Sequence, residues 1–158
     1  MALAAALWGD PKVTALIGGP FTEDQIMERL RMEMASMSAH HVQYWPIFLL
    51  ENDQHVGCAG LRLYRVDEGV YELGFHIRTA YWGQGIAQEA ALAVVKFGFE
   101  TLGGAGLQSC GRRPRRPVRH VQTYSSRRAV MGSTRVAFRA GRSLASMAAT
   151  SRMPATAA

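Results

Sequence analysis

The stretch Tyr71-Glu-Leu-Gly-Phe-His-Ile-Arg-Thr-Ala-Tyr-Trp-Gly-Gln-Gly-Ile-Ala-Gln-Glu-Ala90 decides how this sequence folds. Positions 71, 73, 75 and 77 are apolar and alternate with Glu72, Gly74, His76 and Arg78, a pattern that predicts a β-strand. A Gly-x-Gly turn follows. Residues 86–102 then carry a single polar stripe and predict a helix that is mostly buried. The order is therefore strand, tight turn, helix.

The turn is suited to binding an anion. Gly83 and Gly85 have no side chains, so the backbone can approach a ligand closely. The free N–H groups of the turn and of the first helical residues point outward, and the helix dipole favours negative charge there. A pyrophosphate group fits such a site. A Rossmann dinucleotide-binding loop is excluded, because position 88 is Gln instead of a third glycine. A loop that binds nucleoside triphosphates is excluded, because no Gly-Lys-Ser/Thr ending is present.

The N-terminal part predicts helices. We expect them over residues 2–8, 12–17 and 22–39, the last beginning with a capping box formed by Thr22 and Gln25. The buried face of this third helix should carry four residues spaced by helical turns, with Glu28 and Glu33 off that face. The four residues are Ile26, Leu30, Met34 and Met37.

Three strands should follow, over residues 44–50, 55–64 and 70–78. The turns between them are short, so the three strands should form an antiparallel meander. Pro46 cannot donate a hydrogen bond to a neighbouring strand, which places it at an edge or a bulge.

The motif Glu72-Leu-Gly-Phe-His-Ile77 followed by Tyr81-Trp-Gly-Gln-Gly-Ile-Ala-Gln-Glu-Ala90 resembles the coenzyme-binding motif of GNAT N-acetyltransferases. It is most similar to the branch typified by ribosomal-protein N-terminal acetyltransferases. Residues 56–61 resemble that branch's preceding strand, and residues 7–19 its first helical region. The resemblance covers residues 3–108. It implies an α+β fold, with a mostly antiparallel sheet flanked by helices, that is incomplete at both ends.

The resemblance also implies an activity and a binding site. The activity is transfer of an acetyl group from acetyl-CoA, the co-substrate, to a primary amine on a protein N-terminus or a small molecule; no metal is implied. In the family, main-chain groups of the strand pair with the pantetheine arm, and the turn wraps the pyrophosphate. The position of Ala80 often carries Arg or Gln in the family, which is a departure. The matching residues are Phe75, His76 and Ile77 on the strand, and Gly83, Gln84, Gly85, Ile86 and Ala87 in the turn.

Acetyl transfer requires a base that takes a proton from the acceptor amine. Glu72 lies on the polar face of the predicted strand and could act directly or through water. It could equally be an exposed carboxylate, or form an ion pair with Arg62 or Arg78. His76 is adjacent, and we expect it to contribute its backbone rather than its imidazole.

Charge divides the chain into two unlike segments, although the net charge of the whole is +6. All twelve acidic residues lie within residues 1–100, whereas residues 101–158 hold eleven arginines and no acid. The sequence therefore predicts a partial GNAT domain over residues 1–108 and a basic, low-order tail over residues 109–158. The resemblance to the family implies a strand before the first helix. It also implies that the coenzyme-binding helix is followed by a fifth strand, then a helix, then two more strands. Only the start of that fifth strand is indicated, at residues 105–109.

Three explanations of the tail stay open. It could be a basic extension that contacts nucleic acid or the ribosome through residues 112–142, in which case the chain could be a binding module rather than an enzyme. It could be a divergent but folded end of the domain. It could also be translated out of frame, since it is rich in residues whose codons begin with two G/C bases. Without a complete fifth strand, we expect this chain to be a poor or inactive acetyltransferase.

The remaining features concern the cellular compartment. Cys58 and Cys110 have neither metal-ligand spacing nor a disulfide framework, which favours unpaired thiols in a reducing compartment. Residues 1–8 are apolar but lack a basic lead and a cleavage pattern, so they predict a helix and no signal peptide. No apolar run approaches the ~18 residues of a membrane span. We therefore expect a cytoplasmic protein without membrane contact, whose oligomeric state and acceptor stay open.

Overall fold

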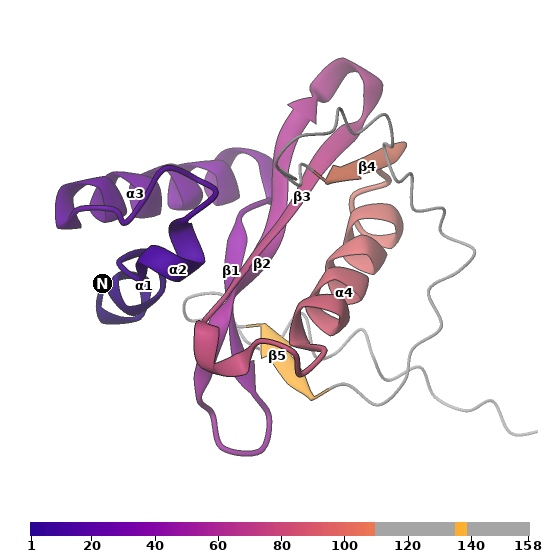
Figure 1. Cartoon of the computed structure of the whole chain (residues 1–158). Coiled ribbons are helices and arrows are strands. Elements are labelled where there is room, and N and C mark those ends of the chain that lie inside the picture. The colour runs from indigo at the N-terminus through magenta and orange to yellow at the C-terminus, as the bar shows by residue number, and fades with distance from the viewer. Residues whose placement is uncertain (110–134, 139–158) are drawn as a thin grey trace, which may run out of the picture.

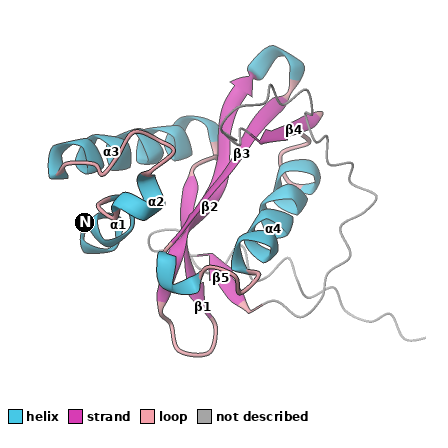
Figure 2. Ribbon diagram, in the orientation of Figure 1, coloured by secondary structure: helices cyan, strands magenta, loops and turns pink. Residues whose placement is uncertain are grey.

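A computed structural model describes residues 1–109 and 135–138 of the chain. Within these residues, five strands form one sheet in the order β4-β3-β2-β1-β5, and helices cover both faces (Figure 1, Figure 2). The helices are α1 (Ala2–Trp8), α2 (Pro11–Thr14), α3 (Glu23–His40) and α4 (Ile86–Glu100). The strands are β1 (Tyr44–Leu49), β2 (His55–Arg65), β3 (Val70–Ile77), β4 (Gly106–Ser109) and β5 (Val136–Phe138).

The sheet is mostly antiparallel. The expected meander β1-β2-β3 is confirmed, and β5 adds to it antiparallel to β1. The exception is β4, which follows α4 and returns beside β3 in parallel. This crossover through a helix is the connection that parallel neighbours require. The pairing spans only four residues, from Val70 opposite Gly106 to Leu73 opposite Ser109.

One face of the sheet packs against α4 and forms the larger core. Ala90, Val94 and Val95 of α4 are buried in one cluster with side chains from all five strands. The ring of Trp45, 1% exposed, meets Phe97 of α4 edge-on at 5.2 Å between centroids. Burial of such large apolar side chains contributes about 1.5–3 kcal/mol each, so this contact fixes α4 against the sheet.

The opposite face packs against α1 and α3 and has a buried polar centre. Leu7, Trp8 and Ile26 lie against Tyr44 and Cys58 in a smaller cluster. The capping box of Thr22 and Gln25 is present at the start of α3, as expected.

The predicted buried face of α3 is wrong at two positions. Met34 is 62% exposed, whereas Glu33, which was expected to lie off the face, is 5% exposed. The Glu33 carboxylate accepts hydrogen bonds from the Tyr44 backbone N–H at 2.7 Å and from Arg62 at 2.5 Å. A buried carboxylate is tolerated when it is paired in this way, so hydrophobicity alone misplaced the helix face by one residue.

The strand that the sequence indicated at residues 105–109 is present as β4, and residues 136–138 of the expected tail form β5 against β1. Pro46 lies next to Ile47, where the β1–β5 pairing ends and the β1–β2 register shifts. The basic run and the rest of the tail, residues 110–134 and 139–158, lie outside the described residues. The three explanations of the tail therefore concern a part of the chain that the structure does not describe.

Close packing at Gly60 yields a stability prediction. A Cβ at this position of β2 would overlap the backbone carbonyl oxygen of Gln43, and backbone cannot rotate away. We expect Gly60→Ala to lower the free energy of unfolding by about 3 kcal/mol, measured by urea denaturation. Gly106→Ala is the matched control, because a Cβ there meets Val70 at an ordinary 3.5 Å. A Gly60→Ala protein as stable as the control would contradict the β1–β2 packing described above.

Candidate functional site

The edge of β3 beyond Leu73 is open along the described chain, because the pairing of β4 with β3 stops there. In an antiparallel pair, the N–H and C=O groups of successive residues point alternately to the two neighbours. The Arg78 N–H donates to the Val56 carbonyl at 2.9 Å, so even-numbered residues at this end of β3 face β2. The main-chain groups of Phe75 and Ile77 therefore face the open edge.

The turn after β3 ends at an uncapped helix N-terminus. Gly83 and Gly85 have φ values of +75° and +79°, a region that only glycine adopts readily. Gly85 is the N-cap residue of α4, and no side chain caps the first turn of the helix. The first N–H groups of α4 are thus available to a ligand, and the helix dipole adds positive potential.

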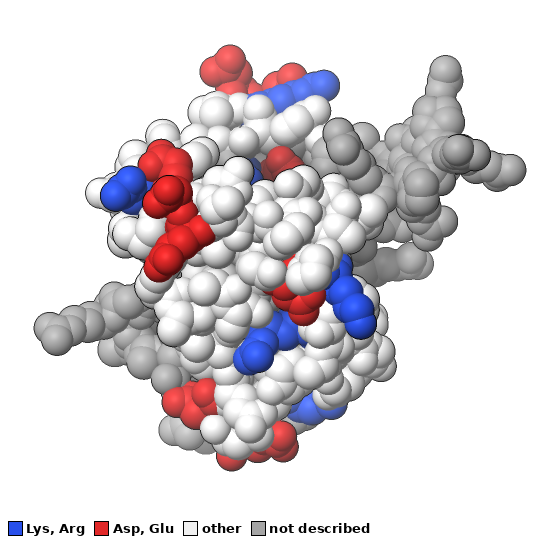
Figure 3. Space-filling model, turned by 60° about the vertical axis from the view of Figure 1, so that its left-hand side comes forward, with Lys and Arg blue, Asp and Glu red and all other residues white. Residues whose placement is uncertain are grey.

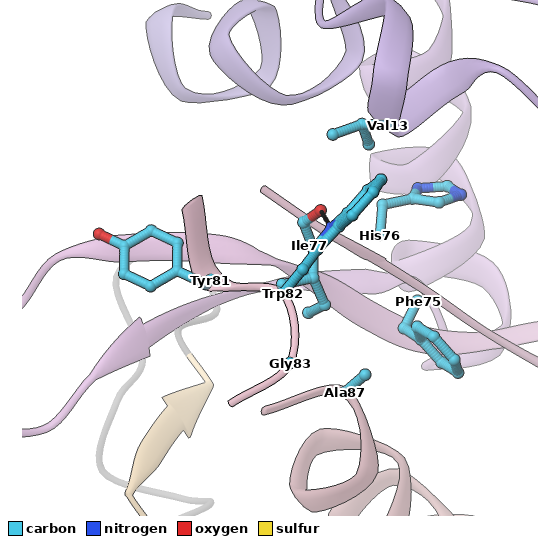
Figure 4. Close-up of a pocket in the computed structure, with 8 residues that line it drawn as sticks. All are labelled: Val13, Phe75, His76, Ile77, Tyr81, Trp82, Gly83 and Ala87. Atoms are coloured by element: carbon cyan, nitrogen blue, oxygen red, sulfur yellow. Dashed lines mark hydrogen bonds between the residues drawn. The ribbon is translucent and has the colours of Figure 1, made fainter. Parts of the chain in front are cut away.

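A pocket of about 300 Å³ joins the strand edge to this turn (Figure 4). Phe75 is 42% exposed, and Trp82, 54% exposed, donates from its indole N–H to the Ile77 carbonyl at 2.7 Å. This bond holds the loop over the end of β3. The lining residues are Val13, Phe75, His76, Ile77, Tyr81, Trp82, Gly83 and Ala87.

His76 is among the residues that line the pocket, and its main-chain groups face β2. Trp8 donates from its indole N–H to His76 Nδ1 at 3.0 Å. Because Nδ1 is an acceptor, the neutral ring carries its proton on Nε2. Burial, together with the positive charges of Arg29 and Arg62, lowers the pKa of His76 to about 4. The imidazole is therefore neutral at physiological pH.

Glu72 lies on the same face of β3 as His76 but does not line the pocket. It sits opposite Arg62, which instead contacts Glu33, and no described residue forms an ion pair with Glu72. Between Glu72 and His76, the Tyr44 hydroxyl lies against Gly74, where a Cβ would overlap it. Burial raises the pKa of Tyr44 to about 12, so the phenol stays protonated. Tyr44 therefore separates the carboxylate from the pocket.

Of the expected turn residues, Gly83 and Ala87 line the pocket and Gly85 occupies the N-cap position, whereas the Ile86 side chain is 2% exposed and belongs to the core. Gln84 donates from its side chain to the Ala80 carbonyl at 3.1 Å, which closes the loop.

Sequence reasoning missed Val13, Tyr81 and Trp82 as lining residues. The two aromatic residues stood in the quoted motif, directly before the glycines, and their size in a loop was a usable signal. Val13 comes from α2, and its place depends on a contact distant in sequence. Asp10, which caps α2 by accepting from the Lys12 N–H at 2.8 Å, also accepts from the Thr79 hydroxyl at 3.3 Å.

A metal site, a membrane span and a nucleic-acid surface each have requirements that can be compared with the described residues. No cluster of three or more His, Cys, Asp or Glu side chains suited to a metal ion occurs there. None of the helices in residues 1–109 has the length and apolar character needed to cross a membrane. On the face shown in Figure 3, basic side chains are scattered among acidic and uncharged ones and form no single basic patch. The proposed nucleic-acid contact, residues 112–142, lies almost wholly outside the described chain.

The lowered pKa of His76 predicts how stability depends on pH. Between pH 6.5 and about 4, the unfolded chain binds a proton at His76 and the folded chain does not, so stability should fall as pH falls through this window. The loss over the window is on the order of 3 kcal/mol, and stability should be level above it. Urea denaturation at several pH values measures this.

His76→Asn is the comparison variant, because the amide oxygen can still accept from Trp8. The pKa of His55 is also lowered, by burial and by Arg78, so the variant should keep a smaller pH dependence. Identical pH profiles for the two proteins would show that His76 titrates normally.

A family model described as an acetyltransferase (GNAT) domain matches residues 1–142. The uncharacterized N-acetyltransferase p20 of Bacillus licheniformis is 28% identical over 97 residues, which cover 60% of this chain and 54% of that protein. The chain thus spans about half the length of this curated relative.

Solved structures show the same fold. An acetyltransferase from Agrobacterium tumefaciens matches with a TM-score of 0.60 at 24% identity, over 68% of this chain and 62% of that one. A GNAT-family acetyltransferase from Bacillus anthracis matches with a TM-score of 0.57 at 25% identity, over 68% of this chain and 63% of that one. The family model covers most of the sequence and includes the open strand edge and the glycine turn, so the chain belongs to the GNAT acetyltransferase family.

Proposed function

We propose that this chain transfers an acetyl group from acetyl-CoA to a primary amine, with slow turnover, because β4 pairs with β3 over only four described residues. The observation that carries the proposal is the pocket that runs from the open edge of β3 to the uncapped N-terminus of α4. An amide-containing arm with a pyrophosphate at one end matches this combination, because the strand edge offers main-chain hydrogen bonds and the turn offers N–H groups to an anion.

We assign the two ends of the coenzyme to these two features. The main-chain groups of Phe75 and Ile77 face the open edge and pair with the pantetheine arm; the Ile77 carbonyl already accepts from Trp82, so Phe75 supplies most of the contact. The pyrophosphate lies on the turn from Gly83 to Ala87. Every contact at the turn is made by backbone, which explains how a loop with Ala80 in place of Arg or Gln remains able to bind.

The reaction requires positioning more than a strong base. The acceptor nitrogen attacks the thioester carbonyl, a C–N bond forms, the C–S bond breaks, and the amine proton leaves as the thiolate of CoA is protonated. Glu72 takes the amine proton through water, because Tyr44 stands between its carboxylate and the pocket. Glu72 lies on the face of β3 that packs toward α1 and α3, so the acceptor approaches from that side. The acceptor is a protein N-terminus or a small-molecule amine.

The glycine turn provides the test of coenzyme binding. Gly85→Val should abolish acetyl-CoA binding measured by calorimetry, because the side chain would fill the space that the pyrophosphate needs. Gly103→Val is the matched control: its φ is +65°, no atom lies within 4 Å of its Cβ, and it stands at the other end of α4. Gly103→Val therefore introduces a similar backbone strain at a position far from the glycine turn. Equal affinities for the two variants would remove the turn from the site.

The proposed base gives a second test. Glu72→Gln should lower kcat by about a hundredfold, with KM for acetyl-CoA nearly unchanged. Glu68→Gln is the control, since this exposed carboxylate lies in the turn between β2 and β3 and forms an ion pair with Arg65. Unaltered turnover in Glu72→Gln would show that no carboxylate at this position takes the proton.

A further inference from the structure

Arg135 reaches the glycine turn from the start of β5. Its Nη2 donates a hydrogen bond to the Gln84 carbonyl at 2.6 Å. A Cβ on Gly85 would lie 3.7 Å from the same nitrogen. A residue 50 positions downstream of the turn thus contacts the backbone at its centre, although its side chain is 61% exposed and could point into solvent.

Glu89, in the first turn of α4, holds Arg135 in place. The carboxylate accepts hydrogen bonds from the backbone N–H groups of Arg135 and of Val136, the latter at 2.9 Å, and lies 3.5 Å from Arg135 Nε. The Arg135 carbonyl accepts from the Leu50 N–H at 2.9 Å. Backbone and guanidinium are both anchored, so the contact with Gln84 is set by its surroundings.

The contact bears on the direction of one N–H group. In a trans peptide the carbonyl of residue 84 and the N–H of Gly85 point in opposite directions. A donor fixed on the Gln84 carbonyl therefore fixes where the Gly85 N–H points. The orientation of this peptide depends on ψ of Gln84 and φ of Gly85, and a glycine restrains φ little. A charged donor on the carbonyl also polarises the peptide, which strengthens its N–H as a donor.

We propose that Arg135 is a positioning residue for the phosphate-binding turn: with Glu89, it orients and polarises the Gln84–Gly85 peptide so that the N–H is presented to the pyrophosphate of acetyl-CoA. The proposal rests on the proposed coenzyme binding and adds the C-terminal strand to that site. Arg135, which directly precedes β5, would also take over the role of the Arg or Gln side chain that the family often has at the position of Ala80, and it would act through the backbone.

The test compares Arg135→Gln with the unaltered full chain on two ligands. Acetyl-CoA carries the pyrophosphate, whereas S-acetylpantetheine has the same thioester arm without phosphates. We expect Arg135→Gln to weaken acetyl-CoA binding about tenfold and S-acetylpantetheine binding less than twofold, measured by calorimetry and by NMR titration. Arg65→Gln is the control, because Arg65 is similarly exposed and similarly paired, with Glu68, but is the last residue of β2. It should leave both affinities unchanged.

Two further variants keep the test decisive. Arg135→Lys retains the positive charge and a donor, so its affinity for acetyl-CoA should lie between the affinities of the unaltered chain and of Arg135→Gln. Glu89→Gln removes the ion pair but keeps an acceptor for the backbone, so it should weaken acetyl-CoA binding in the same selective way. Thermal unfolding of each variant reports on the fold independently.

Several results would overturn the proposal. One is equal affinity of Arg135→Gln and the unaltered chain for acetyl-CoA. Another is an equal loss of affinity for acetyl-CoA and for S-acetylpantetheine, which would show that Arg135 only supports the fold in general. A matching loss in Arg65→Gln would indicate nonspecific attraction by charge. If the unaltered chain does not bind acetyl-CoA, the proposed function fails and this inference fails with it.

Discussion

The alternation of backbone direction along β3 is the constraint on which the rest of the site depends. Even-numbered residues bond to β2, so the odd-numbered ones must face the other edge, and within the described chain β4 covers that edge only as far as Leu73. Buried main-chain polar groups are almost always paired. The edge described here lies beside a pocket and leads to a helix N-terminus, so the proposed coenzyme would complete the hydrogen bonding of the sheet.

Local sequence was sufficient to predict much of this arrangement. The alternation in residues 71–78, the glycines at 83 and 85 and the capping box at Thr22 each specify structure within a few residues, and each is confirmed. Glu33 was misplaced because its partners, Tyr44 and Arg62, come from two different strands. The short β5 has no pattern of its own, since three residues show no period, and it is defined by its pairing with β1.

The same distinction applies to the site. The turn residues could be predicted as a group because glycine marks backbone conformation directly, and both glycines have the positive φ that such a turn requires; their role in binding stays a prediction. The roles of His76 and Glu72 depend on what covers β3, which the sequence does not state. Burial and two arginines keep His76 neutral, Trp8 donates to its Nδ1, and Tyr44 covers the strand between the two residues. The Trp8–His76 and Tyr44–Gly74 contacts span 68 and 30 positions, so no local pattern predicts them.

The two sides of β3 also explain how one strand can serve two substrates. The proposed coenzyme contacts use the open edge, whereas the proposed acceptor side is the face toward α1 and α3, where Glu72 and His76 point. Trp8 bonds to His76, and Asp10 bonds to Thr79 in the loop that leads to the glycine turn. The N-terminal helices are therefore fixed relative to the same strand and loop that would hold the coenzyme. An acceptor bound by these helices would be aligned with the thioester without a moving part, which suits a reaction whose rate depends on positioning.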